Sequence, residues 1–302
     1  MGCDRVVAAA HTLMLSILMG LMGCAGLSRE KPTLAYDADT FRATIVARVP
    51  EISPGLSHAP HEIDEATIER ARRHVTAIAR GPARIQALVD FLSAPEPEGL
   101  GLVYDWSVSG TAARTIERGR GNCIALASVL VGLGRALDWP IFYAEARPQR
   151  PETQAFEEVV ALSDHMAVLV VARSVQMIID FAGPLDELYS VRPIDDLTAY
   201  AHILNNLSAQ IVMSEHATAS VAAWQRAAAG FDLATRIEPE LGRAWNNLGI
   251  ALSKLGRFDE ARDAYRRAVE LDTAFGSAER NLTMMETRAL GETTISKGPL
   301  PE

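Results

Sequence analysis

Residues 118–137 read RGRGNCIALASVLVGLGRAL and join a glycine-containing turn to a long apolar run. The leucines of the run recur at the spacing of three and four residues that is typical of a helix, and they are Leu126, Leu130, Leu133 and Leu137. Gly119 and Gly121 permit a tight turn directly before the run. We therefore expect a helix that starts at Cys123, where unpaired backbone N–H groups can stabilise a thiolate or an oxyanion.

Two apolar strands are expected downstream of this helix. Residues 165–172 and 175–181 are rich in β-branched side chains and are separated by a short turn, which predicts an antiparallel hairpin. His165 begins the first strand, and Asp180 lies near the end of the second. The hairpin would place a base and a carboxylate side by side at one end of the sheet. A thiol with such partners is a candidate nucleophile.

The order Cys123, His165, Asp180 resembles the bacterial branch of the transglutaminase-like cysteine hydrolase superfamily. The resemblance covers residues 62–197 and includes Gly121-Asn122-Cys123 at the helix start. It implies an α+β fold, a papain/transglutaminase-like core in which helices pack on a small antiparallel sheet. It also implies that Cys123 attacks a carboxamide or peptide carbonyl, His165 transfers the proton and Asp180 fixes the imidazole. The resulting acyl-thioester would be resolved by water or by an amine.

The predicted triad needs an oxyanion donor, and each of its members also has a structural alternative. The backbone N–H of Cys123 is the first donor expected, with Tyr104 and Trp106 as further candidates. Alternatively, Cys123 is a small buried hydrophobe, His165 binds a backbone carbonyl and Asp180 caps a turn. Neither a Cys-x-x-Cys nor a His-x-x-x-His pair occurs, so we expect no metal and no other cofactor.

Residues 1–24 resemble the signal peptide of a bacterial lipoprotein. The stretch 6–22 carries no Asp, Glu, Lys or Arg and only just reaches the roughly 17–25 residues that span a bilayer. It ends in Leu21-Met22-Gly23-Cys24, which is similar to a lipobox, so Cys24 is the expected lipidation site. An uncleaved membrane anchor is the alternative. Removal of Cys3 and acylation of Cys24 would leave Cys123 as the single free thiol of the mature chain.

Residues 25–61 contain several prolines and no sustained periodicity, so we expect a tether. A strand is expected within it at Phe41–Val49, where apolar residues alternate. From Glu62 the apolar spacing becomes helical, and residues 62–197 are expected to form the transglutaminase-like domain. Within this domain, the polar segment 147–163 is long enough to be a loop that frames a cleft.

Residues 198–290 carry a helical repeat. The sequence Trp245-Asn246-Asn247-Leu248-Gly249 resembles the start of a tetratricopeptide repeat, a helix-turn-helix unit of about 34 residues. Further matching positions are Ala251, Gly256, Phe258, Ala261, Tyr265 and Ala268. A shift by one repeat length places a preceding unit at about 205–240 and puts Ser214 where a leucine is expected.

Two further segments end the chain. Residues 278–290 look like a capping helix, and residues 291–302 are expected to be a flexible tail. Because each repeat needs neighbours to bury its apolar face, and stability usually takes about three units, we expect the array to dock on the transglutaminase-like domain.

The composition narrows the class of function. The chain has 302 residues, 48% of them hydrophobic, and a formal net charge of −9, which offers no basic surface for nucleic acid. We expect a lipid-anchored enzyme of the cell envelope that acts on a peptide or protein substrate and binds a protein partner through its repeats. Because Ala25 rather than aspartate follows Cys24, its expected place is the periplasmic face of the outer membrane. The alternative is a catalytically inactive lipoprotein adaptor.

Overall fold

The computed structural model is a mixed fold of helices and sheet. It describes residues 33–148, 153–156, 159–162, 165–172, 175–182, 188–214, 219–271 and 277–296. The expected signal peptide at 1–24, with Cys24, lies outside these residues and stays a prediction. Within the described ranges, no helix is both long enough and apolar enough to cross a membrane.

Helix α1 (Ala38–Arg48) occupies the segment in which we expected a strand. It begins after Asp37, whose carboxylate accepts a hydrogen bond from the Thr40 amide at 2.8 Å. Its buried positions recur every fourth residue, which is a helical spacing, and they are Phe41, Ile45 and, just beyond the helix, Val49. The expected strand is therefore wrong. The described part of the expected tether (25–61) contains this packed helix and the short helix η1 (Pro54–Leu56).

After α1 and η1, four further helices precede the main sheet, namely α2 (Glu65–Thr76), α3 (Pro82–Ser93), α4 (Ala112–Arg118) and α5 (Cys123–Ala136). Every residue of α5 from Cys123 to Gly134 is buried, as is typical of a helix that is apolar on all sides. Helices α2 and α3 pack against α5 and against each other. The expected helix start at Cys123 is confirmed.

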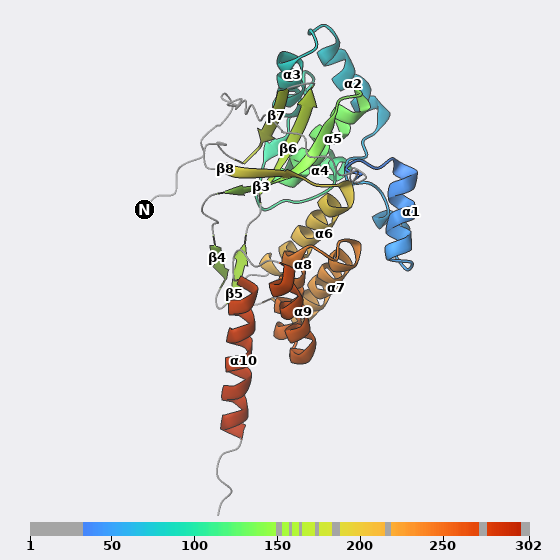
Figure 1. The fold of residues 1–302 in the computed structure, drawn as a ribbon. Coiled ribbons are helices and arrows are strands. Elements are labelled where there is room, and N and C mark those ends of the chain that lie inside the picture. Colours follow the sequence, from blue (N-terminus) through green and yellow to red (C-terminus); the bar gives the residue numbers. More distant parts are fainter. Residues whose placement is uncertain are drawn as a thin grey trace, which may run out of the picture.

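The main sheet has the strand order β7-β6-β3-β8, and neighbouring strands are antiparallel. Its strands are β3 (Ile141–Pro148), β6 (His165–Ala172), β7 (Val175–Asp180) and β8 (Leu188–Pro193). Helix α5 packs on β3 and β6, and Tyr143, Val168 and Ile179 belong to the same buried cluster as that helix. Figure 1 shows this sheet with α2 to α5 in the upper half of the molecule. The hairpin expected from His165 onwards is confirmed.

Two shorter strand pairs lie outside the main sheet. Strand β1 (Val103–Tyr104) pairs in parallel with β2 (Arg120–Gly121), directly before α5. Strands β4 (Thr153–Phe156) and β5 (Val159–Leu162) form an antiparallel hairpin, and β5 contacts α10 (Ser277–Ser296). The polar segment that we expected to frame a cleft therefore contains, in its described part, a hairpin that reaches the C-terminal helices.

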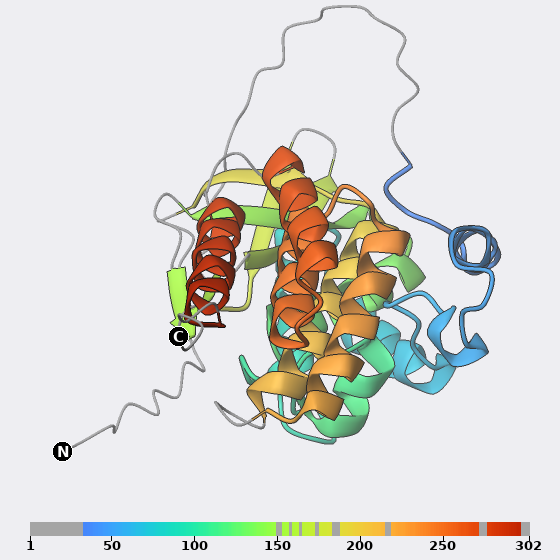
Figure 2. The same cartoon turned by 90° about the horizontal axis from the view of Figure 1, so that it is seen from below.

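The described C-terminal part consists of helices that pack successively against one another, namely α6 (Asp196–Met213), α7 (Val221–Ile237), α8 (Gly242–Lys254), α9 (Phe258–Leu271) and α10. Figure 2, the view from below, shows these helices stacked in front of the sheet. Helix α10 continues to Ser296. It therefore passes the expected end of the capping helix at residue 290, and part of the expected tail (291–302) is helical.

Asparagine side chains link every second helix of this array. Asn247 Nδ2 on α8 donates to Asn205 Oδ1 on α6 at 2.9 Å. In the same way, Asn281 Nδ2 on α10 donates to Asn246 Oδ1 on α8 at 2.9 Å. We call these two bonds the asparagine ladder. They join α6 to α8 and α8 to α10 at equivalent positions.

The asparagine ladder corrects the register of the repeats. It aligns Asn205-Asn206-Leu207 of α6 with Asn246-Asn247-Leu248 of α8, so that Leu207 takes the place of the leucine in the earlier unit. The expected position, Ser214, is instead the C-cap of α6. The fixed repeat length misplaced this helix because the connection between α6 and α7 is longer than that between α8 and α9, and because α7, with 17 residues, is longer than α9, with 14.

The structure has two halves, one that contains the main sheet with α2 to α5 and one that consists of the helical array. Helix α6 contributes to the cores of both. Its residues Ala199 and Ile203 lie in the buried cluster that contains α5 and the sheet. Its residues Leu197, Tyr200 and Leu204 lie in a second cluster with α1 and α7. The expected division of the chain after residue 197 therefore falls inside a helix that both halves share.

Two polar contacts fix α6 to the sheet half. Asp196 accepts two hydrogen bonds from the Arg135 guanidinium of α5, at 2.7 and 2.8 Å, with no exposed side-chain surface of its own. His202 Nε2 lies 3.1 Å from Glu145 Oε1 on β3, and Arg192 donates to the second oxygen of Glu145 at 2.7 Å. These buried charges are paired, as burial requires, and they set how the two halves meet.

Candidate functional site

The turn before Cys123 holds the start of α5 in place. Gly119 ends α4 with a φ of 67°, in the left-handed region that favours glycine. Gly121 has no room for a side chain, because a Cβ atom there would lie 2.6 Å from the Cβ of Ala125. The Asn122 side chain caps α5 and accepts a hydrogen bond from the Ala125 amide at 3.2 Å. This cap was not predicted from the sequence, although Asn before an apolar run is a signal of a helix start.

His165 and Asp180 lie next to each other at one end of the main sheet. Asp180 on β7 is opposite Ala167 on β6, so His165, two residues earlier, is its diagonal neighbour on the same face. His165 Nε2 lies 2.5 Å from Asp180 Oδ1, and the Asp180 side chain is only 3% exposed. The same Oδ1 accepts a hydrogen bond from the Ala182 amide at 2.8 Å. Asp180 therefore caps a turn and also orients the imidazole.

Cys123 is the third member of this group. Its thiol lies close enough to the His165 imidazole to help raise the pKa of that ring. Because Asp180 is bound to Nε2, Nδ1 is the ring nitrogen that remains for Cys123. Cys123 is a free cysteine with 9% of its surface exposed, and the His165 side chain is 22% exposed. The structure thus brings together the three residues that we predicted as catalytic, at the edge of the core.

The His165 imidazole is protonated at neutral pH. Burial disfavours its charged form, but the hydrogen bonds with Asp180 and Cys123, and the negative charges of these two groups, outweigh burial. Together they raise the pKa of His165 to about 10. The protonated ring can donate from both nitrogens at once, which matches its position between Asp180 and Cys123.

Tyr104, one of the two expected oxyanion donors, lies close to this group. Burial raises the pKa of its phenol, and the neighbouring Cys123 and Asp180 raise it further. The phenol is therefore neutral and able to donate a hydrogen bond. Pairing of β1 with β2 brings Tyr104 to this position. Trp106, the second expected donor, is 64% exposed, and its role stays a prediction.

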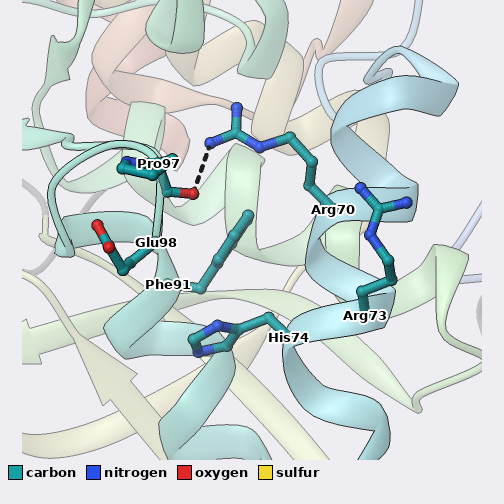
Figure 3. Close-up of a pocket in the computed structure, with 6 residues that line it drawn as sticks. All are labelled: Arg70, Arg73, His74, Phe91, Pro97 and Glu98. Carbon is teal, nitrogen blue, oxygen red and sulfur yellow. Dashed lines mark hydrogen bonds between the residues drawn. The ribbon is translucent and has the colours of Figure 1, made fainter.

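Outside the group around Cys123, the described residues hold no metal cluster but do form a hollow. No group of three or more His, Cys, Asp or Glu side chains in those residues is arranged to hold a metal ion. A hollow of about 460 Å³ between α2 and the loop after α3 is shown in Figure 3. Arg70 donates there to the carbonyls of Pro97 and Gly99, at 3.5 and 2.7 Å, and lies over the Phe91 ring. Its guanidinium holds the loop, so we assign no ligand to this hollow.

The helical array has a groove of its own. It has a volume of about 780 Å³ and is lined by residues of α7, α8 and α9. Leu248 and Leu252 of α8 supply apolar surface, and Asp232 and Glu260 supply negative charge. Arg257 also lines the groove, but both its guanidinium contacts go to Glu260, at 2.7 and 2.6 Å.

Comparison with known proteins identifies a repeat within this array. The family model described as tetratricopeptide repeat matches residues 242–273, which contain α8 and α9. This segment is a tetratricopeptide repeat. The small glutamine-rich tetratricopeptide repeat-containing protein 2 of Mycosarcoma maydis is 31% identical over 72 residues, which make up 22% of this chain and 20% of that protein. The match therefore spans about a fifth of that relative. The repeat supports the binding of a protein partner.

Proposed function

We propose that this protein is a membrane-anchored, transglutaminase-like thiol enzyme that cleaves an amide or peptide bond and binds a protein partner through its repeats. The observation that carries the proposal is the contact of 2.5 Å between His165 and Asp180, with the Cys123 thiol close enough to the same imidazole to help raise its pKa. A nucleophile, a base and a group that orients the base are the parts that acyl transfer requires. Here the nucleophile also lies at a helix start, beside unpaired N–H groups.

The proposed reaction has two steps. The Cys123 sulfur attacks the carbonyl carbon, the carbon–nitrogen bond breaks, and His165 gives its Nδ1 proton to the leaving amine. Water then attacks the thioester and passes a proton to His165, the carbon–sulfur bond breaks, and the carboxylic acid leaves. The Cys123 amide and the Tyr104 phenol are the proposed donors to the oxyanion. General acid–base help of this kind contributes about 10²–10⁴ in rate.

Water is the acceptor that we favour for the second step. An amine in its place would give transamidation through the same thioester. The core at 62–197 is accordingly proposed to be transglutaminase-like, on the order and geometry of Cys123, His165 and Asp180. We include a lipid anchor at Cys24 in the proposal, on the sequence alone, with the periplasmic face of the outer membrane as its place.

A second candidate function is that of an adaptor. The repeat at 242–273 supports protein–protein interaction independently of the thiol. In this alternative, the group around Cys123 is a structural remnant, and the groove beside α8 holds the partner.

Iodoacetamide labelling of the full-length protein in detergent micelles tests the enzyme proposal. Mass spectrometry of the peptide that contains Cys123 separates its rate from those of other cysteines. We expect Cys123 to react at least about tenfold faster than free cysteine near neutral pH, because the thiolate is the reactive form and His165 is placed to stabilise it. His165→Ala should slow the reaction to the rate of a free thiol.

The control for this experiment is His74→Ala, which removes another imidazole from α2. It should leave the rate at Cys123 unchanged. Labelling of wild-type Cys123 no faster than that of free cysteine, or equal rates with and without His165, would favour the adaptor.

A further inference from the structure

Exposed apolar side chains gather in one short segment before the thiol. Val103, Tyr104 and Trp106 are 62%, 40% and 64% exposed, and we call these three residues the apolar shelf. The other large hydrophobic side chains exposed among the described residues are scattered over α1, η1, α7, α9 and α10. Scattered exposed hydrophobics are ordinary, whereas adjacent ones often mark a binding site.

Tyr104 is the member of the apolar shelf that lies beside Cys123. Tyr104 is the partner of Gly121 in the β1–β2 pair, and the Asp105 amide donates to the Gly121 carbonyl at 2.9 Å. Gly121 is two residues from Cys123 in the chain. The Tyr104 phenol is also close enough to Cys123 for their charges to interact. A group that contacts Tyr104 on the apolar shelf is thus adjacent to the reacting sulfur.

Strand β1 has one strand neighbour among the described residues, which is β2. The amides of Val103 and Asp105 donate to β2, at 3.0 and 2.9 Å. In a parallel pair, the residue between two such donors points its own N–H and C=O to the other side. The main chain of Tyr104 therefore faces away from β2. An open strand edge of this kind can pair with an extended peptide.

The charged side chains next to the apolar shelf are already paired. Arg120 Nη1 lies 3.5 Å from Asp105 Oδ2, and Asp105 Oδ1 accepts hydrogen bonds from the Ser107 amide and hydroxyl at 3.0 and 2.6 Å. Arg118 donates to the Ser109 carbonyl at 3.5 Å. Arg120 and Asp105 therefore offset each other's charge next to the shelf, and Arg118 is held by the backbone.

We propose that the apolar shelf binds a large apolar side chain of an extended peptide substrate, beside the carbonyl that Cys123 attacks. This inference rests on the proposed function and adds the class of substrate to it. The main chain of the substrate would pair with the open edge at Tyr104, and its apolar side chain would cover Val103 and Trp106. A peptide with a small or charged residue at that position would lose this contact.

Two peptide vinyl sulfones that differ in one residue, Phe or Gly, next to the electrophile test the proposal on the full-length protein. The Cys123 sulfur adds to the vinyl carbon, so the rate of modification reports binding beside the thiol. We expect the Phe probe to react at least about tenfold faster than the Gly probe, because burial of its apolar side chain on the shelf is favourable. Val103→Ser and Trp106→Ser should each reduce this ratio.

Val221→Ser is the matched control, because Val221 on α7 is 66% exposed. It should leave the ratio of the two rates at the wild-type value. If Cys123 reacts rapidly with iodoacetamide in a His165-dependent way, but both probes react equally or neither reacts, the shelf proposal is overturned and the enzyme proposal stands. A ratio that survives both shelf substitutions also overturns it. Slow iodoacetamide labelling that is independent of His165 contradicts the enzyme proposal itself.

Discussion

The imidazole of His165 lies between a carboxylate and a thiol, and both partners favour its protonated form. In the proposed reaction, a proton held on Nδ1 would be in place for transfer to the leaving amine, so that step would need no proton from solvent. Asp180 holds the opposite nitrogen and is itself held by the Ala182 amide. The backbone amide of Ala182, just after β7, thus holds Asp180, and Asp180 in turn orients the ring.

The raised pKa of His165 predicts how stability changes with pH. The pKa is about 10 in the folded protein and about 6.5 for an ordinary histidine, so the folded state binds the proton more tightly than the unfolded state. The resulting stabilisation is complete below about pH 6.5 and is lost as pH rises through about 10. The wild type should therefore lose more unfolding free energy between these two pH values than His165→Gln does. Urea denaturation at several pH values measures this, and parallel curves would contradict it.

Much of the group around Cys123 could be predicted from the sequence, because each of its members lies at the end of an element. Cys123 follows a glycine turn, and His165 and Asp180 lie on strands joined by a short turn. The approach of Tyr104 rests on β1 and β2, which have two residues each. Strands this short leave no periodic pattern, so the sequence only suggested Tyr104 as a candidate.

At the scale of elements, two expectations failed for physical reasons. In α1, apolar residues occur at every second position, but Ala43 is exposed while Phe41 and Ile45 are buried. The spacing that matters is therefore four, and the cap at Asp37 was the overlooked signal. In α6, the shared Asn-Asn-Leu sequence was present, but a fixed repeat length hid it. The hydrogen bonds of the asparagine ladder reveal the correct alignment.

The asparagine ladder predicts that Asn246→Ala lowers the free energy of unfolding. The substitution removes the acceptor of Asn281 Nδ2 between α8 and α10, and both side chains are buried. Loss of a buried hydrogen-bond partner costs about 1–3 kcal/mol of unfolding free energy. Urea denaturation of the full chain measures the effect. Arg266→Ala, on the exposed face of α9, is the control and should change stability by no more than about 0.5 kcal/mol; equal values for the two variants would show that the ladder contributes nothing.

At the scale of the whole molecule, the ion pair between Arg135 and Asp196 connects the two halves. Asp196→Asn leaves the Arg135 guanidinium, which is only 17% exposed, without its charged partner. Breaking a buried pair in this way costs about 3–5 kcal/mol. Because α6 lies in both cores, we expect amides of α5 and of α7 to lose protection together in hydrogen exchange.

Asp263→Asn provides the control for this substitution, since Asp263 is 80% exposed. It should leave the protection of both helices unchanged. Loss of protection in α5 alone, with α7 unaffected, would mean that the halves unfold independently and that α6 does not couple them.

Because α6 belongs to the cores of both halves, it also limits where the repeats could be exchanged for those of another protein. A chimera that exchanged the repeats for another array at the expected boundary would keep neither Ala199 and Ile203 for the sheet half nor Leu204 for the helical half. The exchange must instead lie after Met213, where α6 ends. The later helices of the array can therefore be exchanged only if α6, its first helix, stays with the sheet half.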